Sequence, residues 1–216
     1  MNRLRILAFM LLATAAAIAF AQRNINFELL AAARSGSEAS VQALLDQGAH
    51  PDTRNRLGDT PLNLAARDGR RSLAKLLLQR GADANLANLA RVTPLMGAAF
   101  SGNADIARLL VESRADLHAV DRVQKTAMVY AAGSGQTECV RVLLEAGVDV
   151  NARYANESTA LMWAAAYGKD DTVALLLERG ADPAARDSRG KSALTIAAEE
   201  RHVQTADRLR SAGAKE

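Results

Sequence analysis

The chain has 216 residues, enough for one extended domain, of which 49% are hydrophobic and only 4% aromatic. Its formal net charge is +3, and removing Arg3 and Arg5, which lie in a segment that we expect to be cleaved off, leaves about +1. A nearly neutral body lacks the basic footprint of a nucleic-acid-binding protein, and the single cysteine, Cys139, excludes an internal disulfide framework.

Residues 1–21 have the pattern of a secretory signal peptide. Two arginines precede an apolar run from Ile6 to Phe20, and Ala19-Phe20-Ala21 is a small-x-small cleavage site. The run is short for a membrane span, which needs about 20 apolar residues. We therefore predict cleavage between Ala21 and Gln22, a bacterial periplasmic or secreted mature protein, and no membrane association after cleavage. An uncleaved anchor is the alternative.

The rest of the chain repeats with a period of 33 residues, and three marks follow this period. The first is a threonine or serine followed by a short segment that favours a helix, as in Thr93-Pro94-Leu95-Met96. Its copies begin at Thr60, Thr93, Thr126, Thr159 and Ser192. The second mark is a glycine series at Gly36, Gly69, Gly102, Gly135 and Gly168. The third is another glycine series at Gly48, Gly81, Gly147, Gly180 and Gly213. Three marks with one period indicate a stacked-repeat protein.

Each unit is predicted to hold two short helices and a projecting turn. The threonine hydroxyl suits the N-cap, and Pro61 suits the first helical position, where a backbone N–H is not needed. Leu62, Ala65 and Ala66 then share one helix face, and the small alanines allow the next unit to approach closely. The second helix ends in a glycine, and the Asn- and Asp-rich residues that follow favour a tight turn.

The phrases Thr-Pro-Leu-x-x-Ala-Ala-x-x-Gly and Leu-Leu-x-x-Gly-Ala-Asp, at this period, resemble the ankyrin repeat. The resemblance implies an all-α ankyrin-repeat solenoid of six stacked helix-turn-helix units with projecting β-turn or hairpin loops, over residues 22–216. The units are expected at about 24–59, 60–92, 93–125, 126–158, 159–191 and 192–216. It also implies a non-catalytic scaffold that binds a protein, but it names no partner.

Several positions depart from the repeat. Arg114 stands where the other units have the second glycine, so either a side chain adopts a left-handed conformation there or the turn has another shape. In the projecting turns, Gly58 and Gly190 give way to Arg91, Gln124 and Glu157 in the three inner copies. Such departures mark places where a scaffold can hold function, although drift in tolerant loops explains them equally well.

The resemblance places partner binding in a concave groove lined by the first helices and the turn tips. Helical spacing gathers Phe100, Tyr130, Trp163 and Tyr167 on one face of the third to fifth units, with Tyr154 on the turn before the fifth. Aromatic anchors are typical of protein interfaces, and Met96 and Met162 in the neighbouring column would add an adaptable apolar surface. The alternative is that these rings only pack between units.

Arginines on the turn tips, among them Arg91, Arg122 and Arg153, form a second candidate surface, suited to an acidic partner. The alternative is a solvated rim, because Asp59, Asp121, Glu157 and Asp187 are interspersed with them.

Nothing in the sequence predicts catalysis, a cofactor or a metal site. His50, His118 and His202 are far apart, and no phosphate loop or nucleophile motif is present. The leading hypothesis is a monomeric periplasmic module that docks one protein partner and, by the resemblance, supports an envelope or stress-defence enzyme. The alternatives are a secreted effector that binds host proteins and an immunity or inhibitor protein that blocks an enzyme.

Overall fold

The computed structural model describes residues 22 and 24–214, and the predicted signal peptide of residues 1–21 lies outside them. Helical residues 24–35 pair with α2 (Glu38–Asp46), and five further helix pairs follow in the described chain. They are α3 (Pro61–Arg67) with α4 (Arg71–Gln79), α5 (Pro94–Ser101) with α6 (Ala104–Glu112), α7 (Ala127–Ser134) with α8 (Thr137–Glu145), α9 (Ala160–Ala166) with α10 (Asp170–Glu178), and α11 (Ala193–Glu199) with α12 (Val203–Ser211).

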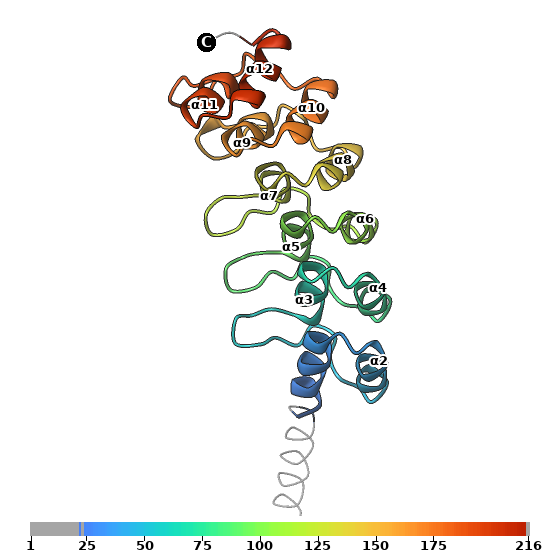
Figure 1. The fold of residues 1–216 in the computed structure, drawn as a ribbon. Helices are drawn as coiled ribbons and strands as arrows, with labels where there is room; N and C mark the ends of the chain where they lie inside the picture. Colours follow the sequence, from blue (N-terminus) through green and yellow to red (C-terminus); the bar gives the residue numbers. More distant parts are fainter. Residues whose placement is uncertain (1–21, 23, 215–216) are drawn as a thin grey trace, which may run out of the picture.

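The helix pairs stack into two columns, and loops project beside the column of α3, α5 and α7 (Figure 1). The inner column contains α3, α5, α7, α9 and α11, and the outer column contains the even-numbered helices. The described residues form no strand, and their one isolated bridge joins Arg186 and Ser192. The predicted all-helical solenoid is therefore confirmed.

The start of each inner helix follows from the repeated hydroxyl residue. Thr60 accepts a hydrogen bond from the backbone N–H of Asn63 at 3.1 Å, and the hydroxyl groups of Thr93, Thr126, Thr159 and Ser192 make the equivalent bond at 3.2–3.3 Å. Each bond satisfies one backbone donor that a helix start leaves without a partner. The same residue type thus fixes where every inner helix begins.

Small residues allow the inner helices to stack. Ala65, Ala98, Ala131, Ala164 and Ala197 occupy one position of the repeat, and each is fully buried. Leucines such as Leu73, Leu110 and Leu143 fill the space between the inner and outer columns. Each unit contacts only its neighbours, so the array is stabilised mainly by the apolar surface buried within and between adjacent units, at about 25 cal/mol per Å².

Five projecting turns, which we call the hairpin turns, precede the capped inner helices at residues 55–59, 88–92, 121–125, 154–158 and 187–191. In each, the first residue donates its backbone N–H to the carbonyl of the last at 2.8–3.0 Å. In four of them the first residue is Asn55, Asn88, Asp121 or Asp187, whose side-chain oxygen accepts two further N–H groups of the turn.

Tyr154 takes this position in the fourth hairpin turn and lacks an oxygen that can close it in the same way. The turn instead contains a short 3-10 segment, Ala155–Glu157, with Asn156 and Glu157 at φ of 59° and 58°. The series of backbone hydrogen bonds between successive turns is also interrupted just before this turn. Backbone bonds link turns one and two, two and three, and four and five, but none links residues 121–125 to residues 154–158 in the described chain.

A second bond is missing between the helix pairs α7–α8 and α9–α10. Asn103 and Gln136, just before α6 and α8, each donate to a backbone carbonyl of the previous inner helix. Lys169, the equivalent residue before α10, makes no side-chain hydrogen bond within residues 22 and 24–214. The side chains of Thr137 and Thr172 still join α8 and α10, with 2.9 Å between their hydroxyl oxygens.

Arg114 adopts a left-handed conformation with φ of 63°, which is the first of the two alternatives that its place in the glycine series left open. A side chain in this left-handed region destabilises the folded state by about 1 kcal/mol. Replacing it with glycine removes that strain, but glycine also gives the unfolded chain more conformational freedom, which offsets part of the gain. We expect Arg114→Gly to raise the melting temperature by a few degrees in a circular dichroism scan. Gly81→Arg, at the equivalent position, should lower it. An unchanged or lower melting temperature for Arg114→Gly would contradict the claim that the backbone at Arg114 is strained.

His118 interrupts a series of bridges between neighbouring loops. The Asn85 side chain donates to the carbonyl of Arg114 at 3.2 Å and accepts from the N–H of Asp116 at 2.7 Å, and Asn151 repeats this in its own unit. We expect His118→Asn to complete the series and add about 1 kcal/mol to the free energy of unfolding, measured by urea denaturation. Asn85→His is the reciprocal control and should be destabilising. Equal stabilities of His118→Asn and the parent chain would rule the bridge out.

Candidate binding surface

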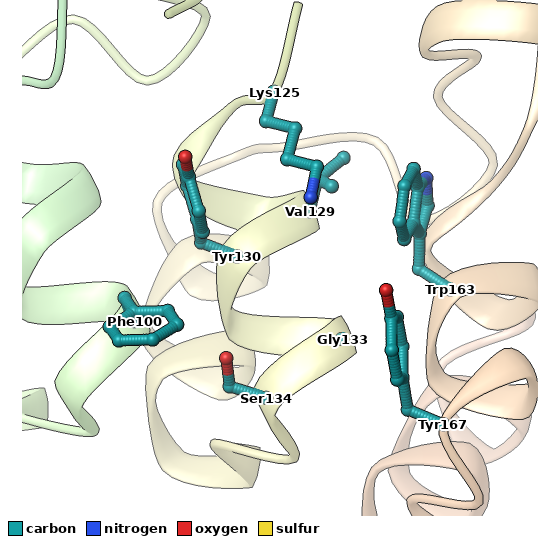
Figure 2. Close-up of a pocket in the computed structure, with 8 residues that line it drawn as sticks. All are labelled: Phe100, Lys125, Val129, Tyr130, Gly133, Ser134, Trp163 and Tyr167. Carbon is teal, nitrogen blue, oxygen red and sulfur yellow. The ribbon is translucent and has the colours of Figure 1, made fainter. Parts of the chain in front are cut away.

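A hollow of about 200 Å³ lies between α5, α7 and α9, and we call it the aromatic hollow (Figure 2). Its wall comes from three successive inner helices and from the end of the third hairpin turn. The lining residues are Phe100, Lys125, Val129, Tyr130, Gly133, Ser134, Trp163 and Tyr167. Phe100 and Tyr167 are 56% and 51% exposed, so the hollow presents ring surface to solvent.

Tyr130 is held in place by the third hairpin turn. Its hydroxyl donates to Oδ2 of Asp121 at 2.5 Å, while Oδ1 of Asp121 closes the turn itself. Burial, together with this bond to a carboxylate, raises the pKa of the Tyr130 hydroxyl to about 12, so the phenol stays a neutral donor at physiological pH. Phe100 meets the Tyr130 ring edge to face at 5.9 Å between centroids.

Trp163 is fixed in a similar way from the fourth hairpin turn. Its indole N–H donates to the Ser158 hydroxyl at 2.8 Å, and that hydroxyl donates to the carbonyl of Ala155 at 2.8 Å. The Tyr167 ring stacks on Trp163 at 6.3 Å between centroids. Two of the four rings are therefore preorganised, which lowers the entropy that a partner must offset on binding.

Gly133 makes room for this stack. It faces the Tyr167 ring from α7, and a Cβ added to Gly133 would lie 3.5 Å from Tyr167 (Figure 2). The equivalent residue one unit earlier is Phe100. A side chain of that size at position 133 would fill the hollow, so the absence of a side chain at Gly133 creates it.

Lys125 extends across the mouth of the hollow between two rings (Figure 2). Its Nζ lies 5.0 Å from the centroid of Trp163 and 5.7 Å from that of Tyr130. Both distances suit a cation–π contact. No carboxylate of the described chain lies within ion-pair distance of this ammonium group.

The structure brings together four of the five aromatic residues that the sequence singled out, namely Phe100, Tyr130, Trp163 and Tyr167. Tyr154 does not line the aromatic hollow. It packs against the core, and its hydroxyl is enclosed without a hydrogen-bond partner among the described residues. Burial raises the pKa of the Tyr154 hydroxyl to about 12.

The prediction for Met96 and Met162 was wrong. They are 1% and 2% exposed, so neither adds an adaptable surface. Adjacent helix positions point about 100° apart, and this turns the methionines into the stack while Gly97 and Trp163 face outward. Asn63 and Val129 occupy the same position and are also buried.

The turn-tip arginines divide into two groups. Arg153 donates to the backbone carbonyls of Glu157 and Arg186 at 2.8 and 2.7 Å, so it joins the fourth and fifth hairpin turns. Arg91 and Arg122 are exposed, and their side chains make no hydrogen bond or ion pair in the described chain. Arg91 and Gln124, which replace the glycine of the outer hairpin turns, both adopt a left-handed conformation, with φ of 63° and 62°.

Sequence reasoning missed Lys125, although a signal was available. Lys125 directly precedes a capping threonine, at the end of a hairpin turn and beside the first turn of an inner helix. The acids that argued for a solvated rim also differ from expectation. Asp59, Asp121 and Asp187 are 5%, 3% and 7% exposed and serve the hairpin turns, so their carboxylates are not displayed to a partner.

The described residues contain no group of three or more histidine, cysteine or acidic side chains placed to hold a metal ion. Every helix found in residues 22 and 24–214 is too short or too polar to cross a membrane. Cys139 is buried, and burial raises the pKa of its thiol to about 11.

A family model described as ankyrin repeats, in three copies, matches residues 29–121, 81–154 and 128–215. The chain belongs to the ankyrin-repeat family. Ankyrin repeats form protein–protein interaction modules, and such domains are generally non-catalytic scaffolds. A search of curated proteins found no match to the chain.

Proposed function

We propose that this ankyrin-repeat protein works in the bacterial periplasm, where it docks a protein partner on the aromatic hollow and the neighbouring hairpin turns. The main support is the hollow itself, which four rings from three repeats line. Two of these rings are exposed, and the other two are half-buried and held by hydrogen bonds. Exposed, rigid aromatic side chains are the residues that most often dominate the free energy of protein binding.

Docking on this surface needs no covalent chemistry. The partner would exclude water from Phe100 and Tyr167, and the fixed rings of Tyr130 and Trp163 would give the contact its shape. The periplasmic location rests on the signal-peptide pattern of residues 1–21. By resemblance to exported ankyrin proteins, the partner would be an envelope or stress-defence enzyme.

Affinity capture from periplasmic extract tests this proposal. The bait is the chain from Gln22, compared with a Phe100→Ala/Tyr167→Ala variant and with a Phe27→Ala/Val203→Ala control, whose exposed apolar residues lie away from the aromatic hollow. We expect one protein to be retained by the parent chain and the control but not by the hollow variant. Equal retention by all three baits would place binding elsewhere, and recovery of the chain in the cytoplasm would contradict the location.

A further inference from the structure

From the charges around the aromatic hollow we infer the chemistry of its occupant: a peptide segment of the partner protein that carries a carboxylate next to a large apolar side chain. This inference rests on the proposed function, since it needs the aromatic hollow to be the docking surface. It adds the sign of the charge that the partner must present.

The ammonium group of Lys125 places a positive charge beside the rings of the hollow. It stands at the mouth of the hollow above two rings and has no carboxylate partner in the described chain. Ring faces attract a cation but do not neutralise it. An incoming carboxylate would therefore meet an uncompensated positive charge next to apolar surface.

The three inner hairpin turns carry further positive charge. Arg91 and Arg122 are exposed on the second and third hairpin turns without an ion pair, and Arg153, just before the fourth, is bonded only to carbonyl groups. Of the acids in these three turns, Asp121 is buried and already accepts three hydrogen bonds. Glu157 is the exposed acid there, so exposed cations outnumber exposed acids on these three turns.

The shape of the hollow limits the size of what can enter it. Its volume of about 200 Å³ suits one large side chain rather than a helix or a folded domain. Gly133 forms its floor, and the rings of Tyr130 and Trp163 form opposite walls (Figure 2). An apolar side chain would enter between the rings while a neighbouring carboxylate contacted Lys125, and complementary charge would orient the segment.

Trp163 provides a local reporter, since it is the single tryptophan of the chain. We would titrate the chain from Gln22 with three heptapeptides that lack tryptophan and tyrosine. Each has a central phenylalanine, flanked by two glutamates, two glutamines or two lysines. Trp163 fluorescence at low salt should show the glutamate peptide binding about five- to tenfold more tightly than the glutamine peptide, with the lysine peptide weakest.

Two variants of Lys125 sharpen the test. Lys125→Met keeps a long side chain without charge and should remove the preference for the glutamate peptide. Lys125→Glu should reverse the order, so that the lysine peptide binds best. A general loss of folding would weaken all three peptides equally and would be seen by circular dichroism, whereas a reversal of preference requires a charge contact at this site.

The outcomes separate this inference from the proposed function. Equal or tighter binding of the glutamine or lysine peptide to the parent chain would overturn the acidic partner while leaving the hollow as a docking site. If no peptide alters Trp163 fluorescence but a captured partner depends on Phe100 and Tyr167, the inferred segment is wrong and the proposed function stands. If the partner is also independent of those rings, both fail.

Discussion

A chain with Trp163→Ala and Tyr130→Ala should lose its partner protein. Hot-spot aromatic residues cost about 2 kcal/mol or more each when truncated, so the pair should weaken binding by at least about 100-fold. The effect should exceed that of Phe100→Ala with Tyr167→Ala, because Trp163 and Tyr130 also anchor the two exposed rings. Isothermal titration calorimetry with the captured protein gives the dissociation constants.

Folding must be separated from binding in this experiment. Both rings are half-buried, and the loss of their hydrogen bonds to Asp121 and Ser158 will lower stability. The variant is therefore used only at temperatures where its far-ultraviolet circular dichroism matches that of the parent chain. Tyr130→Phe is the second control, since it removes the bond to Asp121 but keeps the ring. Parent-like affinity in the folded double variant would show that the partner binds outside the aromatic hollow.

Leu143→Ala should cause a large loss of stability. Leu143 is fully buried in α8, between the inner and outer columns. Removing its side chain leaves a cavity and costs about 2–5 kcal/mol. The melting temperature should fall by roughly 10 °C for a domain of this size. Urea denaturation followed by circular dichroism measures the change.

The neighbouring residue provides a matched control for this prediction. Leu144 is only partly buried in the same helix, so Leu144→Ala makes the same chemical change with less loss of packing. Because an array of repeats holds together through nearest-neighbour contacts, Leu143→Ala should also broaden the transition by uncoupling the helix pairs on either side. Equal effects of the two substitutions would contradict the assigned packing of α8.

The repeat made the fold predictable, because one residue type sets each local structure. Thr60 and its copies begin the inner helices, and Ala98 and its copies permit stacking; both follow from residue chemistry and spacing. The left-handed conformation of Arg114 was predicted only as one of two alternatives, since a turn of another shape was the other way to place a side chain in the glycine series.

The aromatic hollow was predictable only in part. Helical spacing brought Phe100, Tyr130, Trp163 and Tyr167 to one face, but it could not place the flexible side chain of Lys125 between two rings from different units. Met96 was misplaced for a related reason. The period identifies equivalent positions without saying which of them point into the stack, and that depends on how far the next unit covers the helix.

The altered turn at Tyr154 could have been predicted from the repeat spacing. Asn55, Asn88, Asp121 and Asp187 occupy its position, and all of them close a hairpin turn with a side-chain oxygen. Tyrosine there predicts an altered turn rather than a binding ring. The structure agrees, with an irregular fourth turn and a buried Tyr154 hydroxyl.

The most direct test of the docking surface is fluorine NMR of the chain with 5-fluorotryptophan in place of Trp163, its single tryptophan. The spectrum should contain one protein resonance, and addition of the captured partner should shift or broaden it, because the indole lies in the wall of the aromatic hollow. The Phe27→Ala/Val203→Ala control should respond in the same way. A resonance that stays unchanged at saturating partner, with binding verified by calorimetry, would contradict docking at the hollow.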